Sequence, residues 1–263
     1  MRVATWNIKQ AVAPRKPLGD LWSWAAERLT PDIVVFTEGK VPKGGPPPGW
    51  TAQWLEGGIG PRRRWGTVIA GRGVELRPIS AVRSRFRTRH LTHRWPAAVQ
   101  VCEVVRDGTM WGAVVGVYGL TVNLDGASVG HGRYAVPAML EEIEPVVRTY
   151  DNVVVAGDLN LWPKDLPRQF TDLGLIDLVE STASTRPALE GCCGCSMGAR
   201  CGHMWTHRNG NSPRAAVQQI DYIFASRDLA ATCSLVRGGI ADFPDAWDVS
   251  DHAPIVADFD MGS

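Results

Sequence analysis

Short runs of apolar and β-branched residues recur along the chain and alternate with polar or glycine-rich segments. Six of these runs have the length and composition of buried strands. They cover residues 32–36, 67–70, 112–118, 153–156, 220–224 and 254–257. Two longer segments repeat apolar residues every three or four positions, which predicts a helix with one buried face in each. The first contains Leu18, Leu21, Trp22, Ala25 and Leu29, and the second contains Val136, Leu140, Ile143, Val146 and Val147.

Glycine and proline separate these elements, most densely in residues 42–49, which read PKGGPPPG. Such a segment cannot form a central strand, so we expect a surface loop there. The sequence has no repeat of fixed period and no long low-complexity tail. The pattern predicts one α/β domain over residues 1–263, with many strands and few helices.

The composition is that of a globular protein. Hydrophobic residues make up 44% of the 263 residues and charged residues 21%, which excludes a disordered chain. The formal charge of +1 means that any attraction for nucleic acid must be local. No apolar stretch of secretory length follows Met1, and no run is long enough to span a membrane. We therefore expect a cytoplasmic protein with no membrane span, and a monomer.

Polar residues stand where several predicted strands end. Asn7 follows the opening strand, Glu38 follows residues 32–36, and Asp158 and Asn160 follow residues 153–156. Each has an ordinary explanation in turn formation. Loops held by a rigid sheet also carry catalytic groups, and the repetition of this arrangement in one chain favours an active site.

The chemistry of these residues is that of phosphate ester hydrolysis with a divalent metal. Carboxylate and amide oxygens suit Mg²⁺ or Mn²⁺, and Glu38 is the natural anchor for the ion. Asp158 could orient or deprotonate the attacking water, and His252 could bind a phosphate oxygen. Asp221 is the candidate carboxylate that orients the ring of His252.

Six motifs together resemble those of the endonuclease/exonuclease/phosphatase superfamily. They are TWNIKQ (5–10), TEGK (37–40), VYGLTVN (117–123), GDLN (157–160), QQIDYIF (218–224) and SDHAPI (250–255). The resemblance spans residues 1 to about 259 in the order of the family. It implies a DNase I-like fold, namely a four-layer α/β sandwich of two packed mixed β-sheets with helices on the outer faces.

The resemblance also implies residue roles. Asn7, Glu38 and Asp251 would bind the metal; Asp158, Asn160, His252, Asp221 and Tyr118 would serve catalysis; and Lys9, Asn123 and Trp162 would contact the substrate. Tyr118 is typical of members that are similar to apurinic endonucleases and exonuclease III. Lys9 stands where several apurinic endonucleases carry an acidic or amide residue, which leaves one metal or two as alternatives.

The predicted activity is Mg²⁺-dependent hydrolysis of phosphate esters, with Mn²⁺ as a substitute. A nuclease or phosphodiesterase acting on nucleic acid, DNA before RNA, is the leading hypothesis. The rival is a phosphatase acting on a small phosphorylated metabolite or a lipid head group. A binding protein that kept the scaffold and lost the activity is a third class.

Two arginine-rich segments concentrate positive charge. Arg83, Arg85, Arg87 and Arg89 alternate, and Arg62, Arg63 and Arg64 are consecutive. An extended strand would place the four alternating arginines on one face. They could line a groove for a polyanion, or they could protect a solvated edge strand.

A cysteine cluster lies between residues 192 and 207. Cys192, Cys193, Cys195 and Cys201 with His203 could hold a structural Zn²⁺, although the spacing is not a standard paired arrangement. Reduced thiols and a disulfide are the alternatives. His207 at the end of this segment is interpreted as a strand residue. Among the tryptophans, Trp162 and Trp247 are placed where they could form a wall of the substrate pocket.

Overall fold

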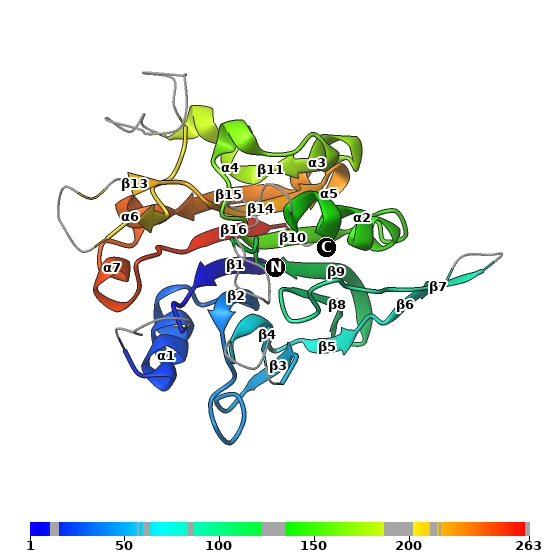
Figure 1. The fold of residues 1–263 in the computed structure, drawn as a ribbon, viewed down its shortest axis with the longest axis horizontal. Helices are drawn as coiled ribbons and strands as arrows, with labels where there is room; N and C mark the ends of the chain where they lie inside the picture. Colours follow the sequence, from blue (N-terminus) through cyan, green and yellow to red (C-terminus); the bar gives the residue numbers. More distant parts are fainter. Residues whose placement is uncertain are drawn as a thin grey trace.

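Two six-stranded sheets stack face to face in the computed structural model of the chain (Figure 1). The structure describes residues 1–10, 16–56, 58–59, 64–83, 87–121, 135–186, 202–210, 215 and 217–260. The first sheet has the order β15–β16–β1–β2–β4–β3. Its strands are β15 (Cys233–Gly238), β16 (Ile255–Phe259), β1 (Arg2–Asn7), β2 (Ile33–Gly39), β4 (Gly66–Arg72) and β3 (Trp50–Trp54).

The second sheet has the order β11–β14–β10–β9–β8–β5. Its strands are β11 (Leu175–Asp177), β14 (Asp221–Ser226), β10 (Val153–Asp158), β9 (Thr109–Val117), β8 (Val99–Arg106) and β5 (Glu75–Pro78). β1 runs parallel to β2 in the first sheet, and β9 runs parallel to β10 in the second. The other described neighbours are antiparallel, so both sheets are mixed.

Alternating side chains bury both faces of each sheet. Val3 and Val35 of the first sheet meet Val154 and Ile223 of the second in the core between the sheets. Residues one position along each strand face outward and pack under helices. α1 (Leu18–Arg28) covers the first sheet with Leu21, Trp22 and Ala25, among other residues, and α2 (Ala135–Val147) covers the second sheet with a larger apolar face. The expected four-layer sandwich is therefore confirmed.

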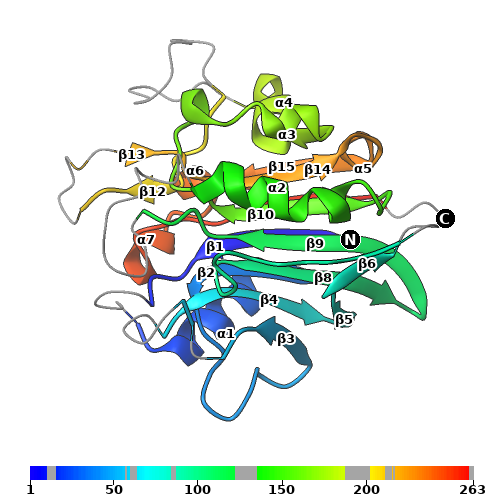
Figure 2. The same cartoon turned by 45° about the vertical axis from the view of Figure 1, so that its right-hand side comes forward.

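The remaining elements are short. They are β6 (Ala81–Arg83), β7 (Thr88–His90), η1 (Pro163–Asp165), α3 (Gln169–Asp172), α4 (Leu178–Ser181), η2 (Ala183–Thr185), β12 (His207–Arg208), β13 (Val217–Gln218), α5 (Arg227–Ala231), α6 (Gly239–Asp242) and α7 (Ala246–Val249). β12 pairs with β13 in a small ribbon apart from the main sheets (Figure 2). Residues 42–49 form turns and coil, as predicted.

The arginine-rich segment after β5 is a hairpin rather than one extended strand. β6 pairs with β7 and projects away from the body of the molecule (Figure 1). Arg83 lies opposite Thr88 and Arg89 lies opposite Val82, so the two arginines point to opposite faces of the ribbon. A single arginine face is therefore not formed by these two residues. Arg85, Arg62 and Arg63 lie outside the described residues.

The cysteine cluster also lies outside the described residues, except for its neighbour His203. Within the described part, Cys102 and Cys233 are free thiols. None of the helices in that part is both long and apolar enough to cross a membrane.

Candidate active site

The predicted catalytic residues meet because the strands that carry them end at the same edge of the sandwich. Asn7 ends β1, Asp158 ends β10, and Asp221 begins the antiparallel strand β14. Each has the same parity as the residues of its strand that face the other sheet, so all three point between the sheets. This end of the sandwich lies toward β12 and α7, on the left of Figure 2.

Asp158 is the centre of this group. It is buried, and its Oδ2 atom accepts a hydrogen bond of 2.8 Å from Nδ2 of Asn7. Its Oδ1 atom accepts a bond of 2.8 Å from the backbone N–H of Asn160, whose φ of 51° belongs to the left-handed region that asparagine tolerates. Asn160 is fixed further by a bond of 2.9 Å from its Nδ2 atom to the carbonyl of Gly119. Burial and the charge of Asp221 raise the pKa of Asp158.

Gly157, before this aspartate, is required by the close approach of β9. Its φ is 150°, and a Cβ atom there would lie 1.8 Å from the carbonyl oxygen of Val117. The glycine of the GDLN motif therefore lets β10 approach the end of β9 closely, where Tyr118 follows.

Glu38 reaches the site through an irregularity in β2. The register between β2 and β4 shifts between Phe36 and Gly39, and Glu38 has a φ of 45°. Regular alternation would place its side chain outward with that of Phe36, whereas the bulge turns it inward. The hydroxyl of Tyr118 donates a hydrogen bond of 2.9 Å to its Oε1 atom. Burial raises the pKa of Glu38, although His252, Tyr118 and Asn7 oppose that rise.

His252 is held between two carboxylates. Its Nδ1 atom lies 2.8 Å from Oδ2 of Asp221, and its Nε2 atom lies 3.8 Å from Oδ2 of Asp158. Burial alone would lower the pKa of His252, but Asp221, Asp158 and Asp251 raise it to about 10. These carboxylates therefore favour the imidazolium form of His252, and Asp221 faces its Nδ1 atom.

Asp251 pairs with Lys9 across the site. The ammonium of Lys9 bonds to Oδ2 of Asp251, and the backbone N–H of Lys9 donates to Oδ1 of Asn7 at 2.9 Å. Burial opposes ionisation of Asp251, yet His252 and Lys9 hold its pKa below the usual value. The sequence placed Asp251 among the metal ligands and Lys9 among the substrate contacts, whereas the structure joins the two residues in an ion pair.

Two groups of residues could hold a divalent cation. Asp158, Asp221 and His252 each bring a ligand atom within 4.8 Å of the other two. In that group, the imidazolium already compensates the carboxylates, and imidazole is a poor ligand for Mg²⁺. Glu38 fits better, because it offers a buried carboxylate next to the amide of Asn7, and oxygen ligands of this kind suit Mg²⁺.

A cavity of about 440 Å³ opens beside Asn160. Trp162, His207 and Gln218 are among the residues that line it. Lys164 lies 4.6 Å from the centre of the Trp162 ring, as a cation over its face. Trp247 is instead partly buried against the core near α1, with the guanidinium of Arg208 4.9 Å from the centre of its ring. Of the two tryptophans, Trp162 lines this cavity, and Asn123 lies outside the described residues.

Sequence reasoning missed three contributors to the site. Ser250 donates a hydrogen bond of 2.8 Å to the carbonyl of Asn7 and accepts one of 3.2 Å from the backbone N–H of His252. His207, which we interpreted as a strand residue only, packs its ring 4.4 Å from that of His252. Gln218 bonds to His207. The sequence around Ser250 and Gln218 does not indicate which residues their side chains will contact.

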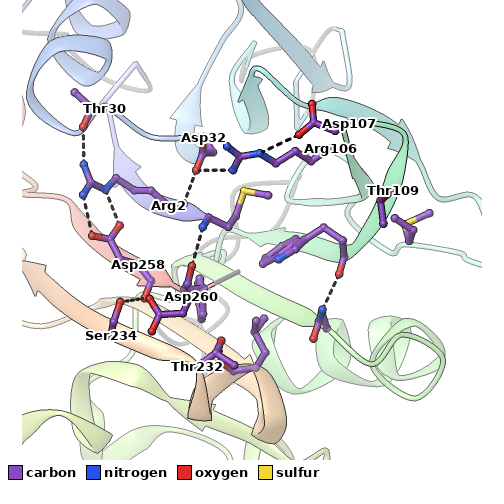
Figure 3. A pocket seen from close by; sticks show the side chains of 16 residues that line it. Arg2, Thr30, Asp32, Arg106, Asp107, Thr109, Thr232, Ser234, Asp258 and Asp260 are labelled. Carbon is purple, nitrogen blue, oxygen red and sulfur yellow. Dashed lines mark hydrogen bonds and ion pairs between the residues drawn. The ribbon is translucent and has the colours of Figure 1, made fainter. Parts of the chain in front are cut away.

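A larger cavity of about 940 Å³ lies at the opposite end of the sandwich (Figure 3). Arg2 forms hydrogen bonds of 2.6 and 2.8 Å with the two carboxylate oxygens of Asp258. Arg106 lies 3.6 Å from the carboxylate of Asp32 and 3.9 Å from that of Asp107. These charges are paired with one another, so the size of this cavity does not make it the reactive site.

Comparison with known proteins gives the same picture over the whole chain. A sequence model described as the Endonuclease/Exonuclease/phosphatase family matches residues 4–252. No curated protein matches the chain.

Solved structures share the fold. An AP endonuclease from Archaeoglobus fulgidus is 19% identical, with 99% of this chain and 100% of that chain covered and a TM-score of 0.67. The 3' phosphatase NExo from Neisseria, bound to product DNA hairpin, is 19% identical, with coverage of 99% and 100% and a TM-score of 0.65. Truncated TDP2 from Caenorhabditis elegans is 16% identical, with coverage of 99% and 97% and a TM-score of 0.63.

Proposed function

Because the chain belongs to the endonuclease/exonuclease/phosphatase family and is a phosphoric ester hydrolase, we propose that it cleaves phosphodiester bonds of nucleic acid. The family resemblance and the enzyme class expected from the sequence are confirmed. The observation that carries the proposal is the convergence of Glu38, Asp158 and the Asp221–His252 pair at one end of the sandwich. These groups supply a cation site, a base and a phosphate-binding cation within one site.

The residues have distinct roles in the proposed reaction. Asp158 orients the attacking water and accepts its proton, since it is held by Asn7 and Asn160. The imidazolium of His252 donates to a non-bridging oxygen of the phosphate, where negative charge develops. Asn160 is fixed beside Asp158 and contacts the same phosphate. Tyr118 holds the carboxylate of Glu38 through its hydroxyl.

Dependence on a divalent metal is typical of the family, and we propose Mg²⁺, with Mn²⁺ as a substitute. Glu38 would hold the ion with Asn7 nearby. When bound, such an ion polarises a phosphoryl oxygen and lowers the pKa of a coordinated water. The ammonium of Lys9 already compensates Asp251, so we assign one metal ion to the site.

The number of metal ions is directly measurable. We expect a titration of the protein with Mn²⁺, followed by electron paramagnetic resonance of the free ion, to give one bound ion per chain. In Glu38→Gln this ion should be lost, because the amide is a weaker ligand than a carboxylate. Two ions per chain in the wild-type protein would contradict the proposal that the ammonium of Lys9 takes the place of a second metal ion.

DNA is the proposed substrate, since a solved structure with the same fold holds a DNA hairpin. We expect a monomer to be active, because one chain supplies all the residues discussed. The test is a panel of single-stranded, duplex and abasic DNA, RNA and phosphomonoesters with Mg²⁺ or Mn²⁺. Cleavage of DNA supports the proposal. Hydrolysis of monoesters alone would identify a phosphatase of small phosphorylated molecules instead.

A further inference from the structure

A chain of hydrogen bonds leads from Trp162 to His207 at the edge of the smaller cavity. The indole N–H of Trp162 donates to Oε1 of Gln218 at 2.7 Å. Nε2 of Gln218 lies 2.8 Å from Nδ1 of His207. An indole nitrogen can only donate, which fixes the amide of Gln218 with its oxygen toward Trp162 and its NH₂ group toward His207. Nδ1 of His207 therefore accepts a hydrogen bond, and the ring hydrogen of the neutral imidazole is on Nε2.

The neighbouring His252 has a different partner at its Nδ1 atom. Its ring lies 4.4 Å from that of His207, and a backbone bridge joins the two residues. Its Nδ1 atom faces the carboxylate of Asp221 rather than an amide N–H, which stabilises the cation. The Nδ1 atom of His207 instead faces the N–H of Gln218, so it accepts a hydrogen bond rather than donating one.

The side chain of Trp162 has no free polar atom left for the substrate. The only N–H of its side chain is bonded to Gln218, and the ammonium of Lys164 lies over its ring. Its position beside Asn160 made it a candidate for substrate contact, but these interactions make it the anchor of the hydrogen-bond chain. His207 is the member of the chain that both lines the cavity and touches His252.

We propose that His207 contacts the substrate, donating from Nε2–H to a sugar or phosphate oxygen of the nucleotide that adjoins the scissile phosphate. This inference rests on the proposed function. The ring donor that His207 can offer to the substrate is Nε2–H, because its Nδ1 atom already accepts a hydrogen bond from Gln218. The cavity of about 440 Å³ beside Asn160 has the size of a small-molecule site and would receive that nucleotide.

The kinetic test compares two diester substrates with His207→Phe, which keeps a ring against His252 and removes the donor. For a DNA oligonucleotide we expect KM to rise about tenfold, which lies within the range for one lost hydrogen bond. For bis(p-nitrophenyl) phosphate, which has no adjoining nucleotide, we expect a smaller loss of kcat/KM than for the oligonucleotide. An equal loss on both substrates would mean that His207 acts only by positioning His252, and an unchanged KM for the oligonucleotide would contradict the contact.

The structural test uses Gln218→Glu. One carboxylate oxygen can still accept from Trp162, but the other faces Nδ1 of His207 and demands a proton there. Heteronuclear NMR of the imidazole nitrogens should show the Nε2–H tautomer of His207 in the wild-type protein and protonated Nδ1 in the variant. Protonated Nδ1 of His207 in the wild-type protein would overturn the inference. If that wild-type protein still cleaves DNA, the proposed function stands without the His207 contact. A wild-type protein that cleaves no nucleic acid would contradict the proposed function and, with it, the His207 contact.

Discussion

The two ends of the sandwich carry similar sets of charged residues but differ in how these residues are buried and paired. At the reactive end, the carboxylates of Glu38, Asp158, Asp221 and Asp251 face two cations, Lys9 and His252. At the opposite end, the carboxylates of Asp32, Asp107, Asp258 and Asp260 lie near Arg2, Arg106 and the N-terminal ammonium. Both ends therefore carry more carboxylates than cations.

Burial separates the two ends further. Asp158 and Asp221 are 1% and 0% exposed, so their charges cannot be screened by water. Within the described residues, Oδ1 of Asp221 is buried and has no hydrogen-bond partner. The side chains of Arg2 and Asp258 are 31% and 22% exposed and form a two-pronged pair. One end therefore leaves charge undercompensated in a dry environment, and the other pairs its charge in contact with water.

This contrast explains why the larger cavity is not the reactive one. Its volume of about 940 Å³ exceeds that of the cavity at the reactive end, but its guanidinium groups already have carboxylate partners. Undercompensated buried carboxylates are costly unless a ligand or a metal uses them. Unbalanced buried charge therefore locates the chemistry better than empty volume does.

The same substitution at both ends gives the largest expected difference. Asp158→Asn should lower kcat for DNA cleavage by about 10²- to 10⁴-fold, because the amide cannot accept the proton of the attacking water. Asp258→Asn should leave kcat within about twofold of the wild-type value, since its partner Arg2 begins β1 and lies at the end of that strand away from Asn7. Steady-state rates measured under saturating Mg²⁺ check both. Equal activity of Asp158→Asn and the wild-type protein would instead favour a scaffold that has lost catalysis.

Metal binding should distinguish the ends next. At an Mg²⁺ concentration of about 100 times Kd, we expect the free energy of unfolding to rise by about 2.7 kcal/mol, because the ion binds the folded state. Urea unfolding with Mg²⁺ or with a chelator measures the increase. Glu38→Gln should abolish most of it, whereas Asp258→Asn should retain it. Loss of the increase in Asp258→Asn alone would place the ion among the acidic residues of the far end.

Strong periodicity explains what could be predicted of the fold. The structure confirms the two predicted helices, α1 and α2, and a strand at each of the six apolar runs. These elements were predictable because each buries a continuous apolar surface. Strands such as β3 and β5 were missed, since they lie at sheet edges and mix exposed with buried residues. The edge position supplies a hydrogen-bonding partner that no local pattern reveals.

The candidate site was predictable where polar residues follow apolar strands. Asn7, Glu38 and Asp158 carry that signal, and the structure brings all three to one end. The inward turn of Glu38 depends on a shift in strand register, which the sequence does not encode locally. The pair of Lys9 with Asp251 joins residues 242 positions apart. Contacts of that kind depend on the assembled sheets, so single-residue roles could be proposed but partners could not.

Arg2 offers the smallest effect and tests whether the far end serves stability alone. Besides its pair with Asp258, it donates a hydrogen bond of 2.6 Å from Nη1 to Oγ1 of Thr30. Arg2→Met should lower the free energy of unfolding by about 1 kcal/mol, a value kept small because the pair is partly exposed. Urea unfolding at low salt measures the loss, and molar NaCl should shrink it because screening weakens the wild-type pair.

Arg2→Lys is the matched control, since it keeps the charge and removes the two-pronged geometry. If geometry provides the stability, Arg2→Lys should lose nearly as much as Arg2→Met, and both should keep the wild-type kcat. A drop in kcat in either variant, at full folding, would mean that β1 transmits changes from Arg2 to Asn7 at its other end. The two ends would then be coupled through the strand, and the division into a reactive end and a stabilising end would fail.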